Sequence, residues 1–106
     1  MQPEQEARNC LSIEDDQAAL SCLKGVVVKY SDNPDVCRPR LVLLTQDGCD
    51  VCKEEATLHA SDIARGIIEK INIKTADGKA IVKNNDIDFV PSLLLLDCKG
   101  KLIVPV

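Results

Sequence analysis

The stretch LVLLTQDGCDVCK, residues 41–53, decides the fold that we expect for this chain. Residues 41–45 form an unalternating aliphatic run, which is typical of a central strand buried on both faces of a sheet. Gly48 breaks this strand, and the residues from Asp50 to about Arg65 are predicted to form a helix. Its inward-facing stripe would consist of Cys52, Ala56, His59 and Ile63, which recur at helical spacing. The stretch therefore indicates a buried strand that leads directly into an amphipathic helix.

On the N-terminal side, the sequence predicts an arm and one helix. Residues 1–12 are polar and aperiodic, which is typical of a flexible arm. Ser12 is the expected N-cap of a helix over residues 13–24, which Gly25 would end. Residues 13–106 would then form a single domain.

The rest of the chain is predicted to alternate between strands and helices. We expect a short strand over 26–30, a turn-rich connection over 31–40, a strand over 67–73, a helix over 78–84, a strand over 92–97 and, after a hairpin turn, a strand over 101–104. Strands that alternate with helices pair in parallel through right-handed crossovers, and the final hairpin adds an antiparallel edge. The expected fold class is α/β, with a mixed sheet of four or five strands flanked by helices.

Composition excludes several classes of partner. The 106 residues suit one domain, and with 45% hydrophobic but only 2% aromatic residues the core must be aliphatic. The net charge of −4 argues against nucleic acid or an anionic membrane as a partner, because both select for a basic surface. No apolar run approaches the length of a membrane span, and the N-terminus lacks the pattern of a signal peptide. A soluble, cytoplasmic protein is expected.

Six cysteines are the main chemical feature of the sequence. Only Cys49 and Cys52 are closely spaced, and they open the predicted helix. Unpaired backbone N–H groups at a helix start stabilise a thiolate and thereby lower the pKa of the first cysteine. The two intervening residues allow the second sulfur to attack a mixed disulfide formed by the first. We therefore interpret Cys49 as the nucleophile and Cys52 as the resolving thiol of a redox pair.

The other four cysteines receive no catalytic role. Cys22 lies on the apolar side of its predicted helix, where a buried, inert thiol is expected. Cys10, Cys37 and Cys98 fall in the arm, the connection and the hairpin, where each is an exposed candidate for regulation and Cys10 for an intermolecular disulfide. Their connectivity does not follow from the sequence. His59 is about 10 Å along the helix from Cys52, too far for direct proton transfer, and is interpreted as a packing residue.

Two segments resemble the thioredoxin superfamily. Residues 45–53, TQDGCDVCK, are similar to its active-site segment, and residues 90–95, VPSLLL, are similar to its second signature, a cis-proline that opens a strand. The resemblance covers residues 41–104 and implies a thioredoxin-like three-layer sandwich. It also implies that Pro91 is cis beside the cysteine pair, and that Val90 offers its backbone to an extended substrate segment.

The same resemblance implies a substrate surface and a set of partners. Gly48, Asp50 and Val51, which flank the two sulfurs, would contact the substrate. The redox-active disulfide would need no further cofactor. The partners would be protein disulfides and a reductase or thiol donor, which the sequence does not identify.

The sequence departs from the family pattern in three ways. Thioredoxins keep a buried carboxylate as proton shuttle at the position of Leu43, so water, Asp47 or Asp50 would have to substitute. The glutathione-binding pattern of glutaredoxins is absent after the strand at 92–97, which favours a glutathione-independent protein disulfide reductase. The usual C-terminal helix is also lacking. Either the helix at 13–24 covers that face of the sheet, or an exposed face drives formation of a homodimer.

Two other classes of function stay open. Cys49 and Cys52 could supply two thiolates to a metal with two more from the other cysteines, although structural zinc sites generally show two close pairs. The fold could also be a non-catalytic binding module that recognises partners around Val90 and Pro91. An oxidoreductase is the expectation, because a module without catalysis has no chemical need for the cysteine pair.

Overall fold

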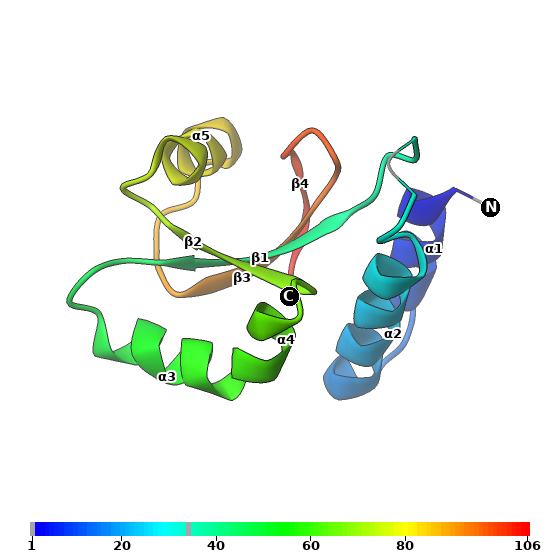
Figure 1. The fold of residues 1–106 in the computed structure, drawn as a ribbon, viewed down its shortest axis with the longest axis horizontal. Coiled ribbons are helices and arrows are strands. Elements are labelled where there is room, and N and C mark those ends of the chain that lie inside the picture. The colour runs from blue at the N-terminus through cyan, green and yellow to red at the C-terminus, as the bar shows by residue number, and fades with distance from the viewer. Residues whose placement is uncertain (1, 34) are drawn as a thin grey trace.

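A computed structural model describes residues 2–33 and 35–106 (Figure 1). Met1 of the expected arm and Pro34 of the expected connection lie outside the described residues. The elements in chain order are α1 (Pro3–Cys10), α2 (Asp16–Lys29), β1 (Arg40–Thr45), α3 (Asp50–Leu58), α4 (Ala60–Ala64), β2 (Ile68–Asn72), α5 (Ala76–Asn85), β3 (Ser92–Leu96) and β4 (Leu102–Pro105). The chain is therefore α/β, as expected. No helix of the described residues is long and apolar enough to cross a membrane.

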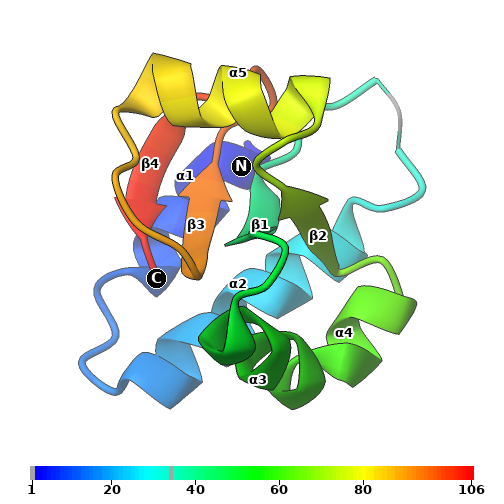
Figure 2. The ribbon, with the colours of Figure 1, turned by 90° about the vertical axis from the view of Figure 1, so that its left-hand side faces the viewer.

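The described strands form one mixed sheet of four strands in the order β2-β1-β3-β4. β1 and β2 are parallel, whereas β3 is antiparallel to β1 and β4 is antiparallel to β3. The expectation that all helix-connected strands pair in parallel is thus wrong for β3. After α5 the chain returns along residues 86–91 to the sheet end where β1 finishes, so that Ser92 lies opposite Leu44 (Figure 2).

Helices cover both faces of the sheet, which gives three layers (Figure 1). On one face, residues of α1 to α4 pack against Leu41, Leu43 and Leu95. On the other, α5 places Ile81 against Val42, Leu44 and further strand residues. Because neighbouring residues of a strand point to opposite faces, the unbroken aliphatic run of β1 supplies both cores, as its sequence predicts.

Residues 3–10 form helix α1, so the expected flexible arm is wrong for most of its length. Pro3 occupies the first turn, where proline costs no hydrogen bond, and Glu4 and Glu6 lie at the helix start. The buried side chains are Pro3, Ala7 and Cys10, which form one helical stripe that the polar composition hides. α1 packs on α2, and Glu6 accepts hydrogen bonds from the Lys29 ammonium and the Tyr30 hydroxyl.

Helix α2 begins and ends later than expected. Its N-cap is Asp15, not Ser12, and the Asp15 carboxylate accepts a hydrogen bond from the backbone N–H of Gln17. Gly25 does not end the helix, and residues 26–29 are helical, so the predicted strand over 26–30 is wrong. Leu23, Val26 and Val27 are buried at helical spacing, and their packing outweighs the cost of about 1 kcal/mol for a glycine inside a helix.

The helix expected from Asp50 to Arg65 is divided at His59. The His59 backbone, at φ −103° and ψ 16°, leaves the helical region, so α3 ends at Leu58 and α4 starts at Ala60. The break changes the direction of the chain, and Ile63 of α4 packs into the core beside β2. α2 contributes Leu23, Val26 and Val27 to the core on this same face, which is one of the two alternatives that the sequence left open for covering it.

Candidate active site at the Cys49–Cys52 disulfide

Cys49 and Cys52 are joined by a disulfide at the start of α3, with their Cα atoms 5.2 Å apart. Cys49 is the N-cap residue, and its Sγ accepts the backbone N–H of Cys52 at 3.0 Å. Cys49 is half-buried, whereas Cys52 is only 3% exposed. The two sulfurs are therefore unequal: one lies toward solvent at a helix N-terminus, and the other is covered by the fold.

The residues that flank the sulfurs are open to solvent. Gly48 has φ +75°, a conformation that side chains rarely adopt, and nothing lies within 4 Å of where its Cβ would be. Asp50 begins α3, and Val51 is one of the exposed large hydrophobic side chains of the chain. The three residues that flank Cys49 and Cys52, namely Gly48, Asp50 and Val51, are therefore all exposed to solvent.

The second sequence signature lies at the same end of the sheet. The Val90–Pro91 peptide bond is cis, which confirms what the resemblance implied. Pro91 directly precedes Ser92, the residue paired with Leu44 near the end of β1. The Val90 side chain packs against the core under α5. Its expected contact with an extended substrate segment would therefore be made by the Val90 backbone alone.

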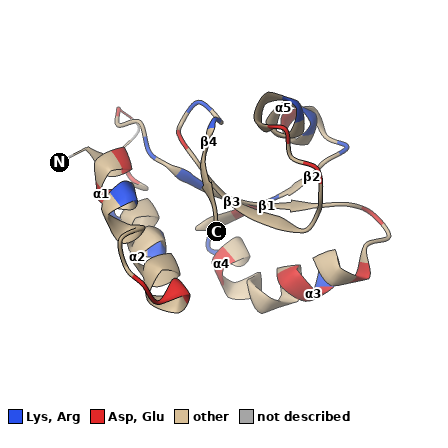
Figure 3. Cartoon of the chain, turned by 180° about the vertical axis from the view of Figure 1, so that it is seen from behind, with Lys and Arg blue, Asp and Glu red and all other residues tan. Residues whose placement is uncertain are grey.

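An apolar groove of about 730 Å³ begins at Pro91 and runs between α2, α3 and the end of β4. Leu43 and Leu93 line it from the sheet, and Leu58 lines it from α3. Its charged lining residues include Asp16 and Glu55. Acidic residues lie at the start of α2 and along α3, where Figure 3 colours the ribbon red. The sequence alone did not predict this groove, because residues from five helices and strands line it.

His59 also lines the groove, and its Nε2 is 3.7 Å from a carboxylate oxygen of Glu55 on the preceding turn. The ring packs at the junction of α3 and α4. This position agrees with its interpretation as a packing residue.

The remaining cysteines form two further disulfides, which corrects the expectation of inert or free thiols. Cys10 joins Cys22, because α1 packs on α2 and brings their Cα atoms to 5.6 Å. Cys37 joins the exposed Cys98 of the β3–β4 turn, across 61 residues of sequence. All six cysteines are therefore paired.

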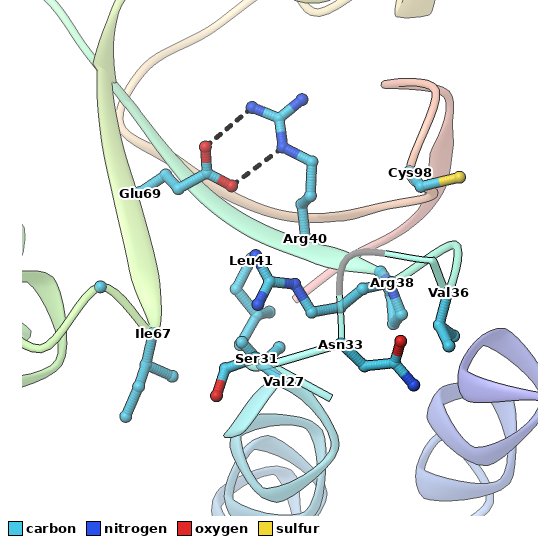
Figure 4. Close-up of a pocket in the computed structure, with 12 residues that line it drawn as sticks. Val27, Ser31, Asn33, Val36, Arg38, Arg40, Leu41, Ile67, Glu69 and Cys98 are labelled. Carbon is cyan, nitrogen blue, oxygen red and sulfur yellow. Dashed lines mark hydrogen bonds and ion pairs between the residues drawn. The ribbon is translucent and has the colours of Figure 1, made fainter. Parts of the chain in front are cut away.

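A second pocket, of about 450 Å³, lies beside Cys98 at the opposite end of the sheet (Figure 4). At its edge the Arg40 guanidinium donates two hydrogen bonds to Glu69, both at 2.9 Å, and approaches Asp77 at 3.4 Å. The hydrogen-bonded Glu69 carboxylate raises the pKa of Arg40. The Arg40 guanidinium is therefore held by carboxylates, and a second arginine, Arg38, also lines the pocket.

Within residues 2–33 and 35–106, no three His, Cys, Asp or Glu side chains are grouped so that they could hold a metal ion. The four other cysteines are not gathered around Cys49 and Cys52. Comparisons with known protein families, with curated proteins and with solved structures found no match for this chain.

Proposed function

We propose that this chain is a thioredoxin-like thiol–disulfide oxidoreductase that exchanges electrons with protein disulfides through Cys49 and Cys52. The observation that carries the proposal is the position of Cys49 as the N-cap of α3. There its sulfur is accessible and accepts the N–H of Cys52. The helix terminus stabilises a thiolate at this atom, which is the form of cysteine that attacks disulfides.

The inequality of the two sulfurs suits a two-step exchange. The Cys49 thiolate attacks one sulfur of a substrate disulfide, whose S–S bond breaks, and the other substrate sulfur leaves as a thiolate. The Cys52 thiolate then attacks Cys49 Sγ and releases the second substrate thiolate. The protein dithiol is oxidised to a disulfide, and the substrate gains two electrons. A covered Cys52 is protected from external reagents but remains adjacent to Cys49.

The groove beside Pro91 favours a polypeptide as the substrate. Most of its lining side chains are aliphatic, and it includes Pro91, which precedes Ser92 at the end of the sheet where β1 finishes. Its acidic residues, among them Asp16 and Glu55, favour segments that carry Lys or Arg beside apolar residues. The proposed reaction does not depend on glutathione, and an external reductase or thiol donor would return the protein to its reduced form.

The two additional disulfides favour an oxidising compartment over the cytoplasm that the sequence predicted. Disulfides with a structural role are rare where glutathione and thioredoxin keep thiols reduced. Cys10–Cys22 and Cys37–Cys98 each connect separate elements of the fold, as structural disulfides do.

The decisive experiment is to measure the reduction potential of the Cys49–Cys52 couple. The protein is equilibrated in dithiothreitol or glutathione buffers, and mass spectrometry of its peptides follows each of the three disulfides separately. We expect a reversible two-electron transition at about −200 to −270 mV, which is lost in Cys49→Ser. If Cys49 and Cys52 form no reversible disulfide in any buffer, the proposal is wrong.

A non-catalytic binding module is the second candidate, and the apolar Leu43 favours it. This side chain is 1% exposed and stands where the family keeps its proton-shuttling carboxylate. Reduction of insulin by dithiothreitol, with and without the protein, separates the two candidates. The oxidoreductase accelerates the reaction, whereas a binding module does not.

A further inference from the structure

A pocket of about 420 Å³ lies against Cys52, on the side of α3 away from the groove's Leu58. Cys52 and Ala56 line it from α3, and Thr45, Asp47 and Gly48 line it from the segment between β1 and α3. The pocket is wide enough for several water molecules, each of which occupies about 30 Å³ in the liquid. Cys52 therefore borders a hydrated space, although little of its own surface is exposed.

Asp47 is the only carboxylate that lines this pocket among the described residues. Its Oδ1 accepts a hydrogen bond from the Asn72 amide at 2.9 Å, and its Oδ2 is 3.7 Å from the Lys74 ammonium. Asn72 lies at the end of β2 and also lines the pocket. The Asp47 side chain is 71% exposed, so its carboxylate lies at the open edge of the pocket with contacts to Asn72 and Lys74.

The other candidate proton acceptors are placed less well. Asp50 is in the first turn of α3 and does not line the pocket. The position at which the family keeps its carboxylate is occupied by Leu43, which is apolar and accepts no proton. The residue paired with it on the parallel strand β2 is Lys70, a cation. His59 and Glu55 line the groove and not this pocket.

We propose that Asp47, acting through pocket water, accepts the proton of Cys52 during the resolving step. This inference rests on the proposed oxidoreductase function. In the mixed disulfide, the Cys52 thiol passes its proton through water to the Asp47 carboxylate. The resulting thiolate attacks Cys49 Sγ, the Cys49–substrate S–S bond breaks, and the substrate sulfur leaves as a thiolate. That thiolate is protonated from solvent, and Asp47 returns its proton to water.

The charges around the pocket are consistent with this role. Lys70 of β2 and Lys53 of α3 both line it, and Lys74 follows β2 beside Asp47. Cations on both sides of the pocket would stabilise negative charge that develops there during the exchange. Asp32, an exposed aspartate in the connection between α2 and β1, lines neither this pocket nor the groove and serves as the matched control.

The test uses protein reduced at Cys49–Cys52 alone, with Cys10–Cys22 and Cys37–Cys98 still oxidised. It follows the reaction with an aromatic disulfide that releases a coloured thiolate, such as Ellman's reagent, under stopped flow across a pH series. The first equivalent of colour reports the attack of Cys49, and the second reports resolution by Cys52. Asp47→Asn keeps an oxygen that can accept the Asn72 amide, so the fold is retained. Thermal unfolding checks this retention.

In Asp47→Asn we expect the second phase to slow at least tenfold at neutral pH and its pH profile to move to higher pH. The first phase should change less than twofold. Asp32→Asn should leave both phases within twofold of the wild type. An unchanged second phase and pH profile in Asp47→Asn would overturn the role of Asp47. A wild-type protein that releases only one equivalent would instead contradict the oxidoreductase function itself.

Discussion

The backbone N–H of Cys52 points at Cys49 Sγ across 3.0 Å, so the more exposed sulfur of the pair is bound at the N-terminus of α3. This contact places a partial positive charge at one of the two sulfurs. The second sulfur, one helical turn further along, is buried. The relationship between these two residues leads to a direct test of their assigned roles.

In the reduced protein, iodoacetamide should alkylate Cys49 before Cys52. Cys49 is half-buried at a helix N-terminus, where backbone N–H groups would favour a thiolate, whereas Cys52 is covered. Peptide mapping by mass spectrometry after short exposures measures the order. Asp50→Asn removes a negative charge beside Cys49 and should raise its alkylation rate at neutral pH by up to about fivefold. Preferential alkylation of Cys52 would contradict the assignment.

Leu58→Ser should weaken reduction of a protein substrate without affecting a small one. Leu58 is 74% exposed and lines the groove, so its loss removes apolar contact area from a bound polypeptide. We expect kcat/KM for insulin to fall about fivefold to tenfold, and the rate with Ellman's reagent to stay within twofold. Val28→Ser is the matched control, because Val28 is 47% exposed on α2 but does not line the groove. Equal effects of both variants would disprove recognition by the groove.

Removal of the Cys37–Cys98 disulfide should destabilise the fold and leave the redox site intact. The bond closes 61 residues of chain, for which the chain-entropy relation gives about 4 kcal/mol in free energy of unfolding. Urea denaturation of Cys37→Ser/Cys98→Ser under oxidising conditions measures the loss. The reduction potential of Cys49–Cys52 should not change, because the two disulfides lie at opposite ends of β1. A shift in that potential would show that the ends are coupled.

Gly78→Ala should lower the stability of the protein. A Cβ at this buried glycine of α5 would lie 2.8 Å from Ile73 Cα and would also clash with the Asn72 carbonyl. Overpacking against backbone costs about 1–3 kcal/mol in free energy of unfolding. Gly25→Ala provides the control, because nothing lies within 4 Å of that helical position. We expect it to stabilise α2 by about 0.5–1 kcal/mol. Thermal and urea unfolding measure both, and a neutral Gly78→Ala would refute the close approach of α5 to β2.

The contact of Glu6 with Lys29 and Tyr30 should make stability depend on pH. Hydrogen bonds from Lys29 and Tyr30 lower the pKa of Glu6 from its ordinary value of 4.5. The stabilisation is therefore present above the pKa of the unfolded chain and is lost as the pH falls through the lower pKa of the folded state. Glu6→Gln should lower the Tm at pH 7, and its difference from wild type should shrink below pH 4.5. A difference that persists unchanged in acid would show that the carboxylate charge is not responsible.

Local patterns in the sequence determined the central part of the fold and the candidate site. The aliphatic run before Gly48 identified β1, since a strand buried on both faces has no polar alternation to obscure it. The same is true of β3 at residues 92–96. Cys49 and Cys52 were identified because their spacing and the helix that follows are local features. The N-cap geometry agrees with that reading.

Only the tertiary structure decided the features that depend on contacts between distant segments. α1 is held by a buried stripe that exists only when α2 lies beside it, and the same packing pairs Cys10 with Cys22. Residues 26–29 are helical, and not the strand predicted over 26–30, because Val26 and Val27 are buried in the core when the chain is helical. The antiparallel direction of β3 depends on how the chain returns to the sheet after α5. The hydrogen bond between Asp47 and Asn72 depends on the pairing of β2 with β1. Periodicity and motif spacing are properties of residues that are close together in the sequence. Cysteine pairing, pockets and strand direction instead arise from packing between residues far apart in the chain.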